Sequence, residues 1–248
     1  MSLIDTIARE IGLLAMPALF NIYFAAAAIP VGFVLAIFLA LGKGSRNGLI
    51  SRLSRGYIYF FRGSPFFIQL FAFYSLMLSF NISTWKPLGI DGLVLHPLFL
   101  GPAILALNTT AYSAEIFYGA LTTVPRGEVE AARAYGMSWG QRFRRIVWPH
   151  LIRIAWPAYT NEVVFLFHAT ALIYFTLPVI GDQKDLMNKA GELFERDYNV
   201  FLHYSVAALY FLAISLAIFY VFGLIYRRLM RHMPGAVPMA FSFKRLLR

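Results

Sequence analysis

Long intervals without charged residues are the feature that most constrains this chain. The interval from Ile11 to Gly42 contains no Asp, Glu, Lys or Arg, and a helix needs roughly 20 apolar residues to cross the hydrocarbon core of a bilayer. Similar intervals recur, so the sequence predicts five transmembrane helices at about residues 13–42, 57–82, 93–121, 158–181 and 199–226. The first interval exceeds one straight span, and Pro17 and Pro30 are its candidate kink sites.

The composition supports an all-α integral membrane protein. The chain is 59% hydrophobic and 14% charged, whereas a soluble domain carries about 25% charged residues. We expect residues 1–248 to form a single transmembrane domain, with the first span retained because its apolar run is too long for a signal peptide. Cysteine is absent, which excludes disulfides, thiol nucleophiles and cysteine metal sites.

The loops between the predicted spans differ in charge. Three segments are strongly basic and two are not, and basic loops remain in the cytoplasm. An N-terminus outside and a C-terminus inside satisfy this rule with an odd number of spans. The net charge of +10 is therefore assigned to topology and to contact with anionic lipid, and no nucleic-acid partner is predicted. The basic residues are Lys43, Arg46, Arg52, Arg55 and Arg62; Arg126, Arg133, Arg142, Arg144, Arg145 and Arg153; and Arg227, Arg228, Arg231, Lys244, Arg245 and Arg248.

The outer loop at residues 182–199 has apolar residues at helical spacing with charges between them. This pattern predicts a short amphipathic helix. The helix either lies at the membrane interface or forms a landing surface for an external partner.

The longest polar passage between predicted spans is the loop at residues 122–157. Ala, Glu and Arg favour a helix over Glu128–Tyr135. Gly136 suits a turn, where a valine should clash, and Ser138 can cap a second helix that starts near Trp139. A helix, a bend and a second helix on the basic side would form a compact knob that can dock in a groove of a soluble partner.

Several polar side chains fall within or beside the predicted spans. Ionisable groups in lipid are costly and are candidates for functional sites. The alternative for the uncharged residues is an interhelical hydrogen bond. Glu115 and Glu162 each need a partner. Arg62 is a candidate for that role, or it simply marks the cytoplasmic end of the second span. Asn161 and Glu162 are expected to open the fourth span. The candidates for a substrate path are Glu162, Glu115, Asn161, Tyr112, Gln69 and His168.

Motifs for nucleotide or metal chemistry are absent from the sequence. It contains no P-loop, no Gly-rich dinucleotide turn and no His-Glu-x-x-His pair, and the five histidines are scattered. We predict no catalytic residues, no metal site and no cofactor bound by this chain. If the chain moves a solute uphill, the energy must come from a partner or from an ion gradient.

The knob also carries a family resemblance. Glu130-Ala131-Ala132, Gly136, Ile146 and Pro149 have the spacing of the signature of the membrane permease subunits of bacterial binding-protein-dependent ABC importers, although Trp148 replaces the usual Leu before the proline. Arg62-Gly63-Ser64-Pro65 resembles a second family segment. Residues 108–117, 157–162 and 168–172 resemble the polar amino-acid branch, which includes histidine, lysine-arginine-ornithine, octopine and nopaline permeases.

The resemblance implies a type I ABC importer permease fold in the bacterial inner membrane. It implies a cytoplasmic coupling helix in which Glu130, Ala131, Ala132 and Gly136 contact an ATPase. It further implies a second permease subunit, two cytosolic ATPase subunits that bind ATP and Mg, and a periplasmic substrate-binding protein. The solute would be a polar, basic amino acid or an opine, with Glu162 and Glu115 facing its cationic groups.

Other classes of membrane protein account for fewer of these sequence features. An ion-gradient-driven secondary transporter would also use intramembrane carboxylates, but it does not explain the knob. A lipid-modifying enzyme would need a nucleophile or metal cluster, and a scaffold would have little use for buried glutamates. Sequence alone leaves open the exact solute, the subunit that holds the main substrate site, and a heterodimeric or homodimeric pore.

Overall fold

The computed structural model describes residues 3–80, 84–179 and 183–231, and these residues are helices and connecting turns without a β-strand. The ends of two expected spans, at 82 and 181, and the tail residues Lys244, Arg245 and Arg248 lie outside the described residues. The helices are α1 (Leu3–Lys43), α2 (Gly48–Gly63), α3 (Phe66–Ser79), α4 (Asp91–Val94), α5 (Pro97–Thr122), α6 (Arg126–Ala134), α7 (Trp139–Arg142), the π-helix η2 (Phe143–Val147), α8 (Trp148–Ala169), the 3₁₀-helix η3 (Thr170–Phe175), α9 (Leu186–Asp197) and α10 (Val200–Met230).

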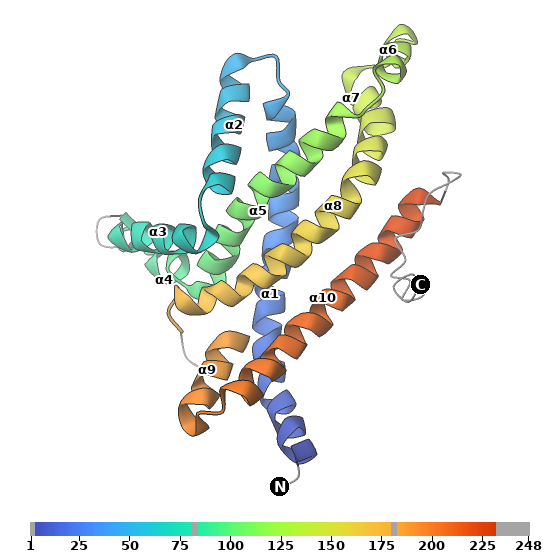
Figure 1. Cartoon of the computed structure of the whole chain (residues 1–248). Coiled ribbons are helices and arrows are strands. Elements are labelled where there is room, and N and C mark those ends of the chain that lie inside the picture. The colour runs from blue at the N-terminus through green and yellow to red at the C-terminus, as the bar shows by residue number, and fades with distance from the viewer. Residues whose placement is uncertain (1–2, 81–83, 180–182, 232–248) are drawn as a thin grey trace.

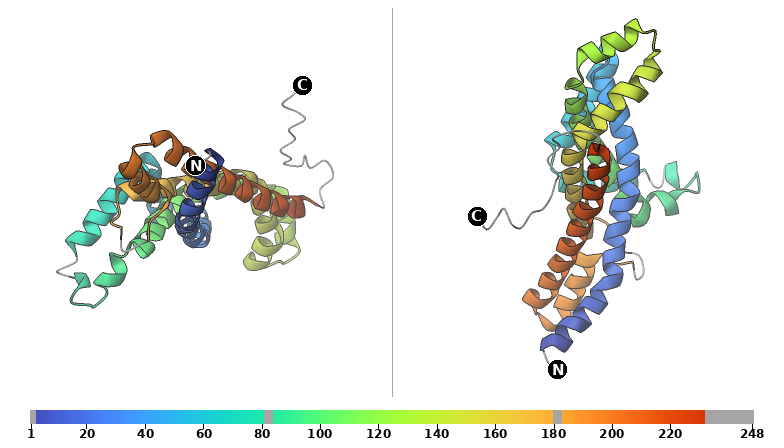
Figure 2. Two further views of the ribbon diagram at one scale, coloured as in Figure 1. Left: turned by 90° about the horizontal axis from the view of Figure 1, so that it is seen from below. Right: turned by 90° about the vertical axis from the view of Figure 1, so that its right-hand side faces the viewer.

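The molecule is elongated, and its two ends are built differently (Figures 1 and 2). The turn between α1 and α2 lies at one end, together with α6 and α7. The start of α1 and α9 lie at the other end. Helix α1 runs between the two ends without a break, so Pro17 and Pro30 lie inside one continuous helix.

Close packing of α1 against α5 forms the centre of the bundle. Ala28, Gly32, Ala36 and Ala40 repeat every four residues and so share one face of α1, and the three alanines are fully buried. A Cβ atom on Gly32 would lie 2.4 Å from Thr109 Cγ2 of α5. Small residues of this kind allow two helix backbones to approach closely, as is common between membrane helices.

The expected second span at 57–82 is not one helix, and that prediction is wrong in this respect. Pro65 disfavours a helical conformation at the preceding residue, and Ser64 is extended at φ −116° and ψ 144°. The chain breaks there into α2, which already begins at Gly48, and α3, which runs across the long axis (Figure 1). Gln69 stabilises the break, because its Nε2 donates to the carbonyls of Phe61 and Ser64 at 2.7 and 2.9 Å.

The expected fourth span, 158–181, also has different bounds. Helix α8 begins at Trp148 and ends at Ala169, and it follows α7 and η2 directly. Pro149 stands at the second position of α8, directly after the π-helix η2, and its missing N–H interrupts the backbone hydrogen bonds there. Asn161 and Glu162 therefore lie inside a helix rather than at its start, which corrects the prediction.

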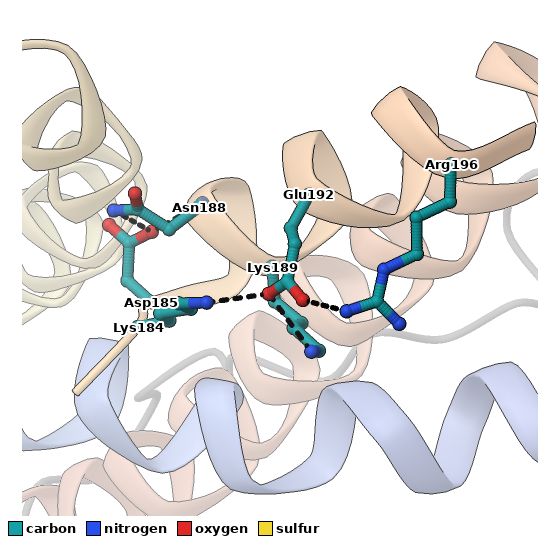
Figure 3. Close-up of polar contacts among 6 residues, drawn as sticks. All are labelled: Lys184, Asp185, Asn188, Lys189, Glu192 and Arg196. Atoms are coloured by element: carbon teal, nitrogen blue, oxygen red, sulfur yellow. Dashed lines mark hydrogen bonds and ion pairs between the residues drawn. The ribbon is translucent and has the colours of Figure 1, made fainter. Parts of the chain in front are cut away.

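The predicted amphipathic helix of the loop at 182–199 is present as α9. Asp185 caps it, with Oδ1 accepting from the Asn188 N–H at 2.8 Å. Burial raises the pKa of Asp185 to about 6. On the outward side, Glu192 lies among Lys184, Lys189 and Arg196 (Figure 3), and hydrogen bonds from the two lysines lower the pKa of Glu192 to about 2.

Two buried polar side chains tie α9 to the rest of the bundle. Asn21 of α1 is fully buried; its Nδ2 donates to Thr170 Oγ1 and its Oδ1 accepts from the Leu186 N–H, both at 2.9 Å. His203 of α10 lies between carboxylates of α1 and α9, at 3.0 Å from Glu10 and 2.7 Å from Asp197. These contacts connect α1, η3, α9 and α10 at one end of the molecule.

Apolar surface is extensive on the outside of the bundle. Among the described residues, two helices are long and apolar enough by themselves to cross a membrane, Asp5–Lys43 and Val200–Met230. The most apolar window of the second helix is only 6% buried. Exposed Leu209, Leu212, Leu216 and Tyr220 run along it, so most of α10 faces outward from this chain.

Candidate functional site: a helical knob and two pockets

The helix–bend–helix knob predicted from the sequence is present as α6 and α7. Gly136 takes a left-handed conformation at φ +75° between them. Ser138 and Gln141 form a capping box, in which the Gln141 side chain accepts from the Ser138 N–H at 2.9 Å. The Gln141 N–H in turn donates to the Ser138 hydroxyl at 3.4 Å. These two contacts fix the start of α7 immediately after the bend, because each satisfies a backbone donor that the helix leaves free.

The four predicted coupling residues differ in exposure. Ala132 is buried at 4% exposure, and its small side chain allows α6 to pack on the following segment. Glu130, Ala131 and Gly136 are exposed. The expected clash of a valine at Gly136 is wrong, since a Cβ there would meet no atom within 4 Å. The left-handed backbone, and not lack of space, is the reason for glycine.

Two exposed aromatic residues on the knob were not singled out from the sequence. Tyr135 is 87% exposed and Trp139 is 66% exposed. The Trp139 ring stacks on Phe143 at a centroid distance of 5.5 Å. Exposed aromatic rings are enriched in protein interfaces, and their position in an otherwise polar segment was the available signal.

A pocket of about 320 Å³ surrounds Glu162 at the contact of α8 with α5 and α3. Tyr112 and Asn108 line it from α5, and Phe66 and Phe165 supply apolar walls. Thr109 Oγ1 donates to Glu162 Oε1 at 2.8 Å. Within the described part of the chain, Glu162 has no ion-pair partner, so its carboxylate remains free to face a cationic group.

Gln69 joins this pocket only indirectly. Its Oε1 accepts from Asn108 Nδ2 at 2.8 Å, and its Nε2 is occupied by the break between α2 and α3. The nitrogen and the oxygen of the Gln69 side chain are therefore both hydrogen-bonded, and the residue is only 3% exposed. Gln69 positions Asn108 and the α2–α3 turn.

Glu115 does not line the Glu162 pocket and lies beside two cationic side chains. Lys43 Nζ contacts its two carboxylate oxygens at 2.7 and 2.5 Å, and Arg62 lies 3.7 Å from it. Arg62 is thus a partner, as the sequence suggested, but Lys43 is the closer one. With two cations beside it, Glu115 is less suited than Glu162 to receive a further positive charge.

The two remaining candidates do not line the Glu162 pocket. Asn161 is exposed on another face of α8, since neighbouring residues of a helix point about 100° apart. His168 Nε2 lies 2.8 Å from Ser215 Oγ of α10 and joins two helices. Among the described residues, no group of three or more acidic or histidine side chains is placed to hold a metal ion.

Residues 15–232 match the family of binding-protein-dependent transport system inner membrane components, and the chain belongs to that family. It is therefore a multi-pass inner-membrane permease of a binding-protein-dependent importer, and it is not itself an enzyme. This membership overturns the alternatives of a secondary transporter, a lipid-modifying enzyme and a scaffold.

Two permeases and one solved structure show what this chain resembles within the family. The chain is 38% identical over 205 residues to the histidine/lysine/arginine/ornithine transport system permease protein HisM of Escherichia coli, covering 82% of this chain and 83% of HisM. It is 41% identical over 142 residues to the nopaline transport system permease protein NocM of Agrobacterium fabrum, covering 57% and 58%. A solved amino acid ABC transporter with histidines matches at a TM-score of 0.68 and 25% identity, covering 92% of this chain and 99% of that chain.

Proposed function

We propose that this chain is a pore-forming subunit of an ATP-driven importer for basic amino acids or opines. A periplasmic binding protein delivers the solute, and a second permease subunit completes the pore as a heterodimer. Two cytosolic ATPase subunits bind ATP and Mg and supply the energy. The observation that carries the proposal is the exposed α6–α7 knob at the end of the same helices, α5 and α8, that form the Glu162 pocket.

Five spans and an outside N-terminus are part of the proposal. The spans are α1, α2 with α3, α5, α8 with η3, and α10. The turn between α1 and α2 lies at the same end as the knob (Figure 1). Lys43 and Arg46 lie at this turn, and Arg126, Arg133 and Arg142 lie in the knob. This arrangement supports a cytoplasmic position for that end, because short basic loops remain inside.

The knob is proposed to dock in a groove of the ATPase. Glu130 supplies charge on its exposed surface, Ala132 allows close packing within it, and Gly136 permits the bend. Tyr135 and Trp139 add exposed aromatic surface. A rearrangement of the ATPase would then move the knob and, through α5 and α8, the pocket around Glu162.

Glu162 is proposed to bind the cationic group of the solute. A guanidinium or ammonium group pairs well with a carboxylate in a pocket of low polarity. Tyr112 and Asn108 are placed beside it, and the names of HisM and NocM support solutes that carry such groups. Glu115, Asn161, Gln69 and His168 are proposed to support the path from outside this pocket.

The experiment is purification of the tagged chain from its native host in mild detergent, with identification of the subunits that accompany it. Recovery of a P-loop ATPase and a second permease is expected, together with uptake of basic amino acids or opines by cells that contain the importer. Glu162→Gln should reduce uptake, because it removes the charge that would pair with the cationic group of the solute. A chain without an ATPase at any stage, or a Glu162→Gln variant with unchanged uptake and preference, would contradict the proposal.

A further inference from the structure

A second pocket, of about 630 Å³, lies between helices α2 and α5 and the C-terminal end of helix α1. Its polar lining is dominated by cations and tyrosines, namely Lys43, Arg55, Tyr59, Arg62 and Tyr112. Arg55, Tyr59 and Arg62 follow each other at intervals of four and three residues. They therefore project from one face of α2 toward the pocket.

The charges around this pocket are not balanced. Glu115 is the acidic partner of Lys43 and Arg62, so three cations share one carboxylate and two positive charges are in excess. Lys43 is held by both oxygens of Glu115. Arg55 takes part in no hydrogen bond or ion pair with any residue that the structure describes. Its guanidinium is available for an anion, and so are the remaining donors of Arg62, whose side chain is 41% exposed.

The cationic pocket adjoins the Glu162 pocket. Tyr112 lines both of them, and the Arg62 guanidinium lies over the Tyr112 ring at 5.4 Å. Tyr112 thus belongs both to a pocket that contains a carboxylate and to a pocket that contains two guanidinium groups. A solute with a cationic end and a carboxylate end would find an opposite charge in each of the two pockets.

We infer that Arg55 and Arg62 form a subsite for the carboxylate of the transported solute, in the pocket that shares Tyr112 with the Glu162 pocket. The inference rests on the proposed function. A guanidinium binds a carboxylate through two parallel N–H donors, which fixes orientation as well as charge. The phosphate of an anionic lipid would satisfy the same donors, but the wall shared with the Glu162 pocket favours the solute.

The test compares two ligands and three proteins in the complete importer, without binding protein, in phosphatidylcholine nanodiscs. The ligands are whichever of arginine, lysine and histidine is taken up fastest and the matching amine without a carboxylate: agmatine, cadaverine or histamine. The proteins are wild type, Arg55→Gln and Arg52→Gln. Arg52 is exposed on the same helix and does not line the pocket, so it is the matched control. Ligand affinity is measured by saturation-transfer NMR.

Wild type should bind the amino acid about tenfold more tightly than the amine, as expected for loss of a charge-assisted contact. Arg55→Gln should remove this difference by weakening the amino acid alone, and Arg52→Gln should preserve it. Equal weakening of both ligands, or no effect on either, would overturn the subsite. The subsite would also be overturned if wild type lost its preference for the amino acid over the amine when phosphatidylglycerol is added to the nanodiscs. The lipid headgroup would then be the ligand that occupies the pocket.

The uptake assay separates the two levels of inference. If wild-type importer takes up none of the basic amino acids or opines, the proposed function fails. If uptake occurs but affinity does not depend on the carboxylate through Arg55, only the subsite fails.

Discussion

Substitutions at Gly136 with increasing backbone strain test whether the bend in the knob couples ATP hydrolysis to transport. A Cβ at this position meets no neighbour within 4 Å, so substitutions there change backbone strain without adding a clash. The φ of +75° costs an ordinary L-residue about 1–2 kcal/mol. Asparagine tolerates this region far better than most residues, and β-branched valine is among the worst.

These costs give an ordered series. Gly136→Asn should remain close to wild type. Gly136→Ala should shift the equilibrium away from the native bend by about fivefold, for about 1 kcal/mol, and Gly136→Val by about thirtyfold, for about 2 kcal/mol. If the knob transmits ATP hydrolysis to the pore, solute transported per ATP hydrolysed should fall in the same order.

The assay is paired measurement of uptake and ATP hydrolysis in proteoliposomes that contain the complete importer. Gly119→Val is the control, because Gly119 lies in α5 outside the knob, also has open space around a Cβ, and has no left-handed conformation. A Gly136→Asn variant as impaired as Gly136→Val would refute the reasoning from backbone strain. A Gly136→Val variant with wild-type coupling would refute the role of the bend.

Three further substitutions test the bundle. Asn21→Leu should lower the free energy of unfolding by about 1–3 kcal/mol, because it leaves the Leu186 N–H buried without an acceptor; thermal denaturation measures the loss. Asp185 has an ordinary pKa of 3.8 that burial raises to about 6, so the folded state favours its proton and stability should decline as pH rises from about 4 to about 6. Asp185→Asn should remove that decline, as denaturation at pH 4.5 and 7.5 would reveal. Gly32→Val should destabilise by about 1–3 kcal/mol, because its Cβ would overlap Thr109.

A specific outcome would contradict each of these three stability predictions. Asn21→Leu with an unchanged denaturation temperature would mean that the Leu186 N–H finds another acceptor. An equal pH dependence in wild type and Asp185→Asn would remove Asp185 as its source. Gly12 provides the control for Gly32, since a Cβ there meets no atom within 4 Å, and equal effects of valine at both positions would argue against the α1–α5 contact.

Features that depend on a few neighbouring residues could be predicted from the sequence. The α6 helix, the turn at Gly136, the Ser138 cap and the amphipathic α9 are local, because propensity, a left-handed glycine and a capping side chain act within a few positions. The structure confirms each of them. Only the expected clash of a valine at Gly136 was wrong, because the space around a bend depends on distant segments.

The tertiary details needed information that local pattern does not contain. Counting uncharged residues treats 57–82 as one span, although Pro65 was visible as a helix breaker. Lys43 and Glu115 are 72 positions apart, so their pairing follows from the packing of α1 on α5. Asn161 and His168 were grouped with Glu162 by proximity in sequence, but on a helix that is apolar on several sides the residue spacing alone does not identify the face that borders a pocket.

Helices α5 and α8 pack against each other as a hairpin that connects the knob to the Glu162 pocket. Glu162 lies 14 residues beyond the start of α8 at Trp148, a distance of about 21 Å along the axis at 1.5 Å per residue. A rotation of this hairpin by about 10° around the level of Glu162 would therefore carry the knob sideways by about 4 Å with little change in helix geometry. A displacement of the size of one side chain at the knob thus corresponds to a small angular change at the pocket, enough to reorient a carboxylate without unfolding any helix.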